Sequence, residues 1–326
     1  MEQANGKNLD RFEAHLKRIN EELNGTLDSR IGLVEDIRKH ALLGNGKRLR
    51  PLFFILCCLL CKYTGNELYR FSTIFEYLHA ASLLHDDVLD NAYMRRNRPS
   101  ANNLWGNRAA VLEGDFLASK TFSIAMSSNN PEIIHELTRV AARMAEGQML
   151  EMLQTGEWNT SKETYMEIIK AKTAVLISAA CSCGAIISGA GKEAENSLGD
   201  FGLNVGIAFQ LIDDLKDYTS SEDKMGKPVG NDLREGKMTL PLIYLFSGIE
   251  KGERERISEL LRKKNATDQD YQTLIASVRK NGVTARVQEE AGFHIKRSIE
   301  NLNSFPDTPF KRDLLYLAWY TLEREC

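Results

Sequence analysis

Apolar residues recur at the spacing of an α-helix along almost every long segment of the chain, and no stretch alternates convincingly as a β-strand does. Within 71–82, for example, apolar or small side chains stand at positions i, i+3, i+4 and i+7. Prolines stand where helices would begin or end, as Pro51 does at the start of an apolar run. The pattern predicts ten or more helices and two conspicuous polar loops, at 91–103 and 223–237.

Nothing in the sequence marks a domain boundary, because the chain has no repeat, low-complexity tract or flexible linker. We therefore expect one all-α domain over residues 1–326, with about the first eight residues flexible. The longest strictly apolar run, 52–61, is too short to cross a bilayer. The run 174–190 is interrupted by serines and rich in alanine and glycine, which predicts a closely packed buried helix and no membrane span.

The composition excludes two classes of protein. With 42 Lys and Arg against 45 Asp and Glu, the formal net charge is −3, which is not that of a nucleic-acid-binding surface. A hydrophobic content of 43% argues against intrinsic disorder. The polar N-terminus lacks the features of a signal peptide, and the six cysteines match no zinc-binding spacing. We interpret the cysteines as reduced, buried thiols of a cytoplasmic protein.

Two acidic clusters share the spacing i, i+1, i+4, and each follows a long apolar helical segment. Their residues are Asp86, Asp87 and Asp90 in HDDVLD and Asp213, Asp214 and Asp217 in IDDLKD. Positions i and i+4 lie about 40° apart on a helix, so each cluster projects at least two carboxylates from one face. The C-terminal end of a helix carries partial negative charge, so carboxylates there need a cation nearby. Carboxylate oxygens are suitable ligands for Mg²⁺, which can bind the phosphates of a substrate at the same time.

A solvated acidic face is the alternative interpretation of these clusters, but two clusters with the same spacing favour a metal site. Neither has the ligand pattern of an EF-hand. His79 lies two turns before Asp86 on nearly the same stripe. Gln210, with the three aspartates of the second cluster, forms a polar stripe on an otherwise apolar helix, which predicts a water-filled or ligand-filled cavity between helices.

Short basic clusters provide charges that could oppose the acidic ones. They comprise Lys47, Arg48 and Arg50 in GNGKRLRP, Arg95, Arg96 and Arg98 in MRRNRP, Lys172 just before an apolar helix, and Lys227 and Lys237 in GKPVGNDLREGK. The planar guanidinium of arginine can donate two parallel hydrogen bonds to a diphosphate. A basic loop directly before a helix also places a bound anion near the helix N-terminus, which attracts negative charge. No Walker-type phosphate loop is present, which argues against an ordinary nucleotide site.

The order of these motifs resembles that of a trans-isoprenyl diphosphate synthase of the polyprenyl synthetase family. The resemblance covers about residues 30 to 325 and rests on GKRLRP, EYLHAASLLHDDVLDNAYMRR, GD at 114–115, KT at 172–173, FQLIDDLKD and GKPVGNDLREGKMTLPL. The first aspartate motif is most similar to that of longer-chain members such as octaprenyl diphosphate synthases. The resemblance implies a helical bundle around a central cavity, of the isoprenoid synthase type. It also implies a homodimer, for which segments 104–126 and 131–153 are candidate interface helices.

The resemblance also implies the role of each motif residue. The first acidic cluster would bind Mg²⁺ that bridges an allylic diphosphate, and the second would hold a further Mg²⁺, with three ions per site. The allylic diphosphate is assigned to Arg95, Lys172, Lys227 and Lys237, and isopentenyl diphosphate to Lys47, Arg50, His79 and Arg96. Thr173 and Gln210 would direct oxygen dipoles at the developing carbocation. Asn97 departs from the glycine that usually follows the arginine pair, but it removes no ligand.

The length of the product depends on the residues below the first acidic cluster. Ser82 lies about 40° from Asp86 and roughly 6 Å back along the helix, with Ala81 beside it. Bulky residues at these positions block elongation early in this family, and both are small here. We therefore expect a product longer than fifteen carbons. Deeper residues that could end the tunnel are Leu78, Phe116, Phe122 and Met126.

Four other functions fit parts of the sequence. A geranylgeranyl diphosphate synthase would share every motif and differ in product length. A class I terpene cyclase would carry an Asn/Asp, Ser/Thr, Glu triad in place of the second DDxxD. A non-catalytic partner subunit of a heteromeric prenyl synthase would have lost aspartates that are intact here, and a helical Mg²⁺-binding scaffold would need no matched cations. A lipid-soluble product could bring the protein into transient contact with a membrane, although nothing in the sequence anchors it.

Overall fold

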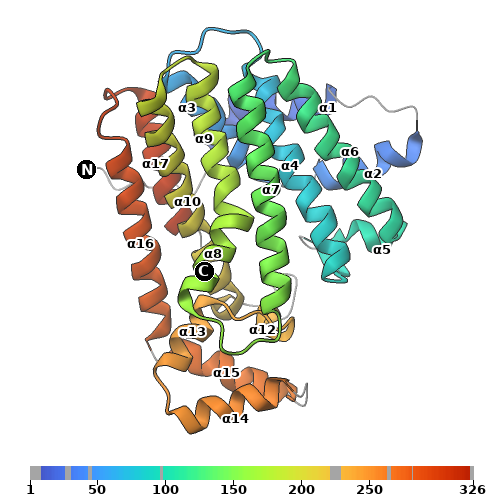
Figure 1. Cartoon of the computed structure of the whole chain (residues 1–326), viewed down its shortest axis with the longest axis vertical. Coiled ribbons are helices and arrows are strands. Elements are labelled where there is room, and N and C mark those ends of the chain that lie inside the picture. Colours follow the sequence, from blue (N-terminus) through green and yellow to red (C-terminus); the bar gives the residue numbers. More distant parts are fainter. Residues whose placement is uncertain are drawn as a thin grey trace. The chain divides into compact units, whose positions relative to one another are not determined.

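The computed structural model describes residues 9–25, 31–42, 46–95, 98–220, 229–262, 266–280 and 282–323, and most of them are helical (Figure 1). The helices in chain order are η1 Asp10–Phe12, α1 Glu13–Gly25, α2 Gly32–Leu42, α3 Leu49–Leu60, α4 Leu68–Leu89, α5 Ala101–Trp105, α6 Asn107–Met126, α7 Pro131–Gln154, α8 Lys162–Ile169, η2 Lys170–Ala174, α9 Val175–Ile187, α10 Lys192–Thr219, α12 Asn231–Arg234, α13 Leu240–Ser247, α14 Lys251–Arg262, α15 Asp268–Lys280, α16 Val283–Asn301 and α17 Pro309–Glu323. The predicted all-α fold with more than ten helices is confirmed.

The helices form two compact units. The first contains Met1–Ala141, Leu176–Gly202 and Ile299–Leu317, and the second contains Ala142–Val175, Leu203–Ser298 and Ala318–Cys326. The boundary between the units falls within α7, α9, α10, α16 and α17. The expectations of one domain over the whole chain and of a central cavity stay predictions. The expectation about residues 1–8 concerns a segment outside the described residues.

In the first unit, α3 is buried on every side between Leu52 and Cys58, as expected of a helix that is apolar all round. α4 and α6 run side by side (Figure 1). α9 approaches α3 so closely that a Cβ on Gly184 would lie 2.7 Å from the Cβ of Cys57. Only a residue without a side chain permits this spacing. This confirms the prediction of a closely packed buried helix in the alanine- and glycine-rich run.

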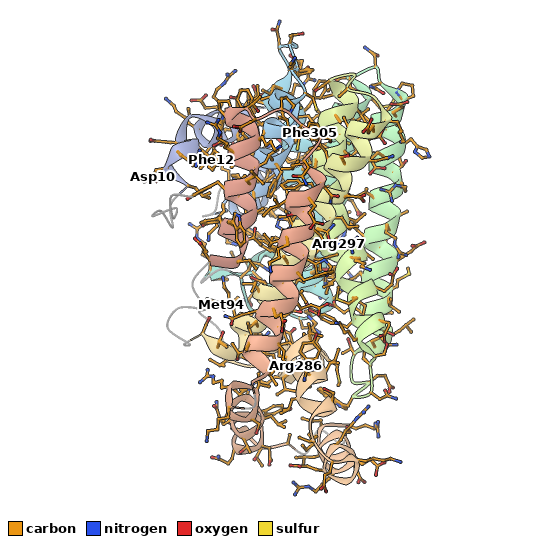
Figure 2. The ribbon with its side chains drawn as sticks, turned by 90° about the vertical axis from the view of Figure 1, so that its left-hand side faces the viewer. Asp10, Phe12, Met94, Arg286, Arg297 and Phe305 are labelled. Atoms are coloured by element: carbon orange, nitrogen blue, oxygen red, sulfur yellow. The ribbon has the colours of Figure 1, made fainter. Side chains whose placement is uncertain are left out.

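The N-terminal turn η1 is held against α17 within the first unit. Phe12 is buried, and its ring centroid lies 6.0 Å from that of Tyr316. Arg11 forms an ion pair with Asp313 and stacks on the same tyrosine ring, 4.7 Å from its centroid. Asp10 and Phe12 are labelled in Figure 2. A buried aromatic ring and an ion pair thus fix the start of the described chain.

In the second unit, α16 carries Arg286 and Arg297 (Figure 2). The guanidinium of Arg286 lies 4.0 Å from the ring centroid of Tyr244 on α13. Arg279 on α15 donates a 2.6 Å hydrogen bond to the carbonyl of Tyr218 near the end of α10. The first contact joins α16 to α13, and the second joins α15 to the helix that carries the second acidic cluster.

In the part of the chain that the structure describes, one helical stretch, Lys162–Ile187, is long and apolar enough to cross a membrane by length and composition alone. However, 78% of its most apolar window is buried inside the protein. Core helices of folded proteins pass the same test, so the stretch is weak evidence for a membrane span.

The first predicted polar loop is more ordered than we expected. Met94–Arg95 (β1) and Arg98–Pro99 (β2) form an antiparallel pair, and α5 begins at Ala101. Sequence analysis missed this strand pair, because strands of two residues are too short for alternating polarity to reveal them. In the second predicted loop, residues 221–228 lie outside the described part, and α12 occupies Asn231–Arg234.

The cysteines of the described residues are free thiols, as predicted. Cys57, Cys58, Cys181 and Cys183 are buried, whereas Cys61 is partly exposed. Burial raises the pKa of the Cys57, Cys58 and Cys183 thiols well above the ordinary value, so these groups stay protonated. Cys326 lies outside the described residues.

Glu113 on α6 is a buried carboxylate whose two oxygens have no hydrogen-bond partner among the described residues. Burial raises its pKa from 4.5 to about 7, and the positive charge of Arg38 on α2 opposes this shift. Between these two values the folded chain binds more protons at Glu113 than the unfolded chain does. The free energy of unfolding therefore falls as pH rises from about 4.5 to about 7, and the full loss persists above pH 7.

We expect Glu113→Leu to raise the free energy of unfolding by about 1–3 kcal/mol at pH 8, because it removes an unpaired buried charge. The gain should be clearly smaller at pH 5, where the carboxyl is protonated in the folded chain. Urea denaturation at both pH values measures the effect. Glu289→Leu, at an exposed position on α16, should change stability by less than about 0.5 kcal/mol. An equal gain at both pH values would contradict the ionisation account.

Candidate functional site

The first acidic cluster lies at the C-terminal end of α4, as predicted, with Asp90 at the helix cap. Asp86 and Asp90 are half-exposed, and the N–H of Asp90 donates a 2.8 Å hydrogen bond to the carbonyl of Asp86. Asp87 is only 3% exposed. The three carboxylates therefore differ: two reach solvent at i and i+4, and the middle one points into the protein.

Asp87 is held by Arg95 of β1. Its Oδ1 accepts a 2.7 Å hydrogen bond from Nε of Arg95, and a second guanidinium nitrogen lies within ion-pair distance. Burial raises the pKa of Asp87, and the guanidinium limits that rise. Arg95, which lies in the paired strand β1, thus fixes Asp87, and the sequence predicts both residues to belong to the site.

The predicted basic loop lies at the start of α3. Lys47 is exposed, Arg50 is half-buried in the first helical turn, and His79 is half-buried on α4. Arg48, between the two basic residues, is buried with Glu76 of α4. The sequence named Arg48 in the cluster but gave no sign that it faces inward.

The residues predicted to control product length lie on α4, before the acidic cluster. Leu78 and Ala81 are buried and Ser82 is half-buried. The hydroxyl of Ser82 donates a 2.8 Å hydrogen bond to the carbonyl of His79, so its polar group is turned to its own helix. Of the deeper residues, Phe116 and Phe122 are half-buried, whereas Met126 is 59% exposed.

In the second unit, a chain of hydrogen bonds joins predicted site residues. Thr173 Oγ1 donates to Gln210 Oε1 at 2.9 Å, and Gln210 Nε2 donates to Asp214 Oδ1 at 2.7 Å. Tyr165 Oη donates to the other oxygen, Asp214 Oδ2, at 2.6 Å. Burial raises the pKa of Asp214 to about 7, against the hydrogen bonds that favour the carboxylate. Both oxygens of Asp214 thus have protein donors.

Lys172 and Thr173 lie in a π-helical turn, Lys170–Ala174, between α8 and α9. As expected, Lys172 lies just before the apolar helix α9, although the helical stretch is continuous from α8 and only widens at this turn. α7 and α10 both approach it closely: a Cβ on Gly147 would lie 2.8 Å from the amide nitrogen of Lys172, and one on Gly206 would lie 2.6 Å from the Cα of Ala174. π turns of this kind occur often at functional sites.

Two of the predicted lysines form ion pairs with neighbouring glutamates. Lys172 Nζ lies 2.5 Å from Oε2 of Glu151 on α7, and Lys237 Nζ lies 2.8 Å from Oε2 of Glu235.

The other two aspartates of the second cluster differ in exposure. Asp213 is exposed, whereas Asp217 is buried and its Oδ2 accepts a 2.9 Å hydrogen bond from the backbone N–H of Asp232 on α12.

The predicted Arg96 and Lys227 lie outside the described residues. Tyr165 and Glu151 were missed by sequence analysis. Tyr165 lies seven residues before Lys172, which would place it on the same helical face, and that spacing was the available signal. Glu151 gave none, because its partner Lys172 is 21 residues away. Within the described ranges, no three His, Cys, Asp or Glu side chains gather closely enough to hold a metal ion by themselves.

Comparison with known proteins supports the motif-based prediction. The family described as Polyprenyl synthetase matches residues 32–278. Octaprenyl diphosphate synthase of Escherichia coli (strain K12) is 32% identical over 307 residues, which cover 94% of this chain and 95% of that protein. The all-trans-nonaprenyl-diphosphate synthase (geranyl-diphosphate specific) of Rhodobacter capsulatus is 33% identical over 305 residues, 93% of this chain and 92% of that protein.

A solved structure resembles the chain over nearly its whole length. The polyprenyl synthase from Caulobacter crescentus CB15, complexed with calcium and isoprenyl diphosphate, superposes with a TM-score of 0.92 at 31% identity. The match covers 98% of this chain and 97% of that one. Together with the ordered motifs, these similarities show that the chain belongs to the polyprenyl synthetase family, whose members are prenyltransferases.

Proposed function

We propose that the chain is a magnesium-dependent trans-polyprenyl diphosphate synthase. It condenses isopentenyl diphosphate with an allylic diphosphate and makes a product longer than fifteen carbons, with the octaprenyl length favoured. One observation carries the proposal: in each DDxxD motif the first aspartate reaches solvent and the second is buried and held by the protein. Asp86 and Asp213 are the accessible members, whereas Arg95 holds Asp87, and Tyr165 with Gln210 holds Asp214.

The accessible carboxylates fit Mg²⁺. This ion binds oxygen ligands in near-octahedral geometry and usually takes only one or two carboxylates, with water and substrate phosphate completing the shell. Asp86 and Asp90 on α4 offer two such carboxylates, and Asp213 on α10 offers one, so neither motif needs three converging side chains. The proposal assigns both motifs to magnesium, with three ions per site. When bound, the ions would neutralise the diphosphate and stabilise the charge that builds on it as it leaves.

The basic side chains would do the rest of the binding. The proposal assigns Lys172, Lys237 and Arg95, with Lys227, to the allylic diphosphate, and Lys47, Arg50 and His79, with Arg96, to isopentenyl diphosphate. The ion pairs Lys172–Glu151 and Lys237–Glu235 hold two of these lysines before the substrate binds. A fixed cation loses less conformational entropy on binding a phosphate than a mobile one does.

The proposed reaction has three steps. The allylic C–O bond breaks, the isopentenyl double bond attacks the carbocation, and a proton leaves for the released diphosphate. The Thr173 hydroxyl uses its hydrogen in the bond to Gln210. The lone pairs of its oxygen stay available, and they would stabilise a developing positive charge. Water would quench the carbocation, so the site must exclude it. Leu78 and Ala81 offer an apolar surface for the growing tail.

We also propose a homodimer. On α6, the large apolar side chains Leu112 and Met126 are 67% and 59% exposed, and Val111 beside them is 37% exposed. On the part of α7 in the second unit, Met149 and Leu153 are exposed to a similar extent. Apolar side chains on a surface helix favour burial against a partner. A second copy of the chain is the partner that the proposal assigns to them.

A cytoplasmic location completes the proposal. Free, buried thiols at Cys57, Cys58, Cys181 and Cys183 fit a reducing compartment. The long product is apolar, so its release would involve transient contact of the protein with a membrane surface.

We expect the purified chain alone to make a polyprenyl diphosphate when it is given both diphosphates and Mg²⁺. Chelation of Mg²⁺ should abolish turnover.

Asp213→Ala should lower kcat by at least about a hundredfold, because several kcal/mol of transition-state stabilisation depend on the ion. Asp200→Ala, at an exposed position on the same helix, serves as the matched control and should keep activity. Turnover only in the presence of another subunit would favour the heteromeric alternative, and a cyclic hydrocarbon product would favour a terpene cyclase.

Ala81→Phe should shorten the product, because the added ring fills the space that the tail needs beside α4. Chromatography of the dephosphorylated products measures the chain length. Ala276→Phe, the same substitution at an exposed site on α15, should leave the product unchanged. If Ala81→Phe keeps the fold and the product length, the tail does not pass this position.

Leu112→Arg should convert a dimer into a monomer, because it places an unpaired charge in the proposed interface. Light scattering after size-exclusion chromatography measures the mass of the particle. Leu33→Arg on α2, where the native leucine is 47% exposed, is the matched control and should remain dimeric. A monomeric wild-type chain at micromolar concentration would refute the dimer.

A further inference from the structure

Arg48 faces the opposite way from its basic neighbours. It stands at the N-cap of α3, between the exposed Lys47 and the half-buried Arg50, and its side chain is only 4% exposed. Its backbone has φ of 52°, in the left-handed region that a residue with a Cβ seldom adopts. The strained backbone at Arg48 turns one side chain of the basic loop inward and leaves the other two outside.

The guanidinium of Arg48 joins three segments of the first unit. Nη1 donates a 2.6 Å hydrogen bond to Oε1 of Glu76 on α4, in a buried ion pair. Nε donates a 3.1 Å bond to Oδ1 of Asn20 on α1, and Nη2 donates to the carbonyl of Leu42 at the end of α2. Because the five donors of a guanidinium form a rigid fork, these acceptors fix its position in three directions.

Glu76 lies three residues before His79, so the two side chains are neighbours on one face of α4. The ion pair therefore connects the basic loop to the turn of α4 that carries His79. Lys47, Arg50 and His79 are the three described residues that the proposed function assigns to isopentenyl diphosphate. They come from two separate elements, and the Arg48–Glu76 pair joins those elements.

We propose that Arg48 is a positioning residue that, through Glu76, sets Lys47 and Arg50 against His79 and so determines the affinity of the enzyme for isopentenyl diphosphate. This inference rests on the proposed function. Glu76 neutralises the charge of Arg48. The positive charges of this loop that would bind the diphosphate are therefore those of Lys47 and Arg50. A small displacement of charged groups around a diphosphate weakens binding strongly, because each hydrogen bond depends on distance and angle.

A purely structural role is the competing account, and the two differ in what they change. Apolar residues of similar volume often replace a buried ion pair without loss of stability, but they supply no directed link to Asn20 and Leu42. The informative variant is therefore the double substitution Arg48→Met with Glu76→Met. Its melting temperature tests the structural account, and its KM for isopentenyl diphosphate tests the positioning account.

We expect the double variant to melt within a few degrees of the wild type and to show a KM for isopentenyl diphosphate about tenfold or more higher. The KM for the allylic diphosphate should change less than twofold. Arg48→Lys, which keeps the charge but loses the fork, should raise the KM for isopentenyl diphosphate by an intermediate factor. An unchanged KM for isopentenyl diphosphate in a folded double variant overturns the proposal, as does an equal rise in both KM values.

Two further variants cover the remaining outcomes. Asn20→Ala removes only the bond to Nε and leaves the ion pair intact. If the double variant does not fold, Asn20→Ala decides: a selective rise in KM for isopentenyl diphosphate supports positioning, and no rise overturns it. Lys47→Ala tests the assignment of the site itself. If Lys47→Ala leaves the KM for isopentenyl diphosphate unchanged, the proposed function fails at this site. If only the Arg48 variants have no effect, the positioning role alone fails.

Discussion

A carboxylate removed from water is stable only where a cation or several hydrogen-bond donors replace the water, and this constraint governs both acidic motifs. Asp87 has the guanidinium of Arg95, and Asp214 has Tyr165 and Gln210. Once the second aspartate of each motif is held in this way, the backbone around it is fixed. The first aspartate is then presented to solvent from a rigid helix end.

The same constraint explains why neighbouring residues in a motif behave differently. Arg48 and Lys47 are adjacent and both basic, yet one is buried with a glutamate and the other is exposed. A sequence motif therefore combines groups that can meet a substrate with groups that hold the motif in place. Glu113 shows the contrasting case, because no donor among the described residues replaces the water that its carboxylate has lost.

The sequence predicted the helical fold well, because helical periodicity is strong in long buried segments such as α3 and α4. It also placed both acidic motifs at helix ends, because apolar runs before them show where the helices lie. It missed the β1–β2 pair, whose strands of two residues leave no periodic signal. It also missed the partners Glu151 and Glu76, since pairs that are far apart in the chain depend on tertiary packing rather than on spacing.

The π-helical turn at Lys170–Ala174 has a consequence for the helical stretch that contains it. One additional residue in a turn shifts the angular phase of everything that follows by about 100°. Tyr165 and Thr173 thus belong to two faces that a regular helix would not combine, and both meet the same hydrogen-bond chain. Deleting a single residue from this turn would leave a regular helix in which α8 and α9 keep their relative faces, whereas tightening the turn to an α-helix without a deletion would rotate α9 by about 100° relative to α8.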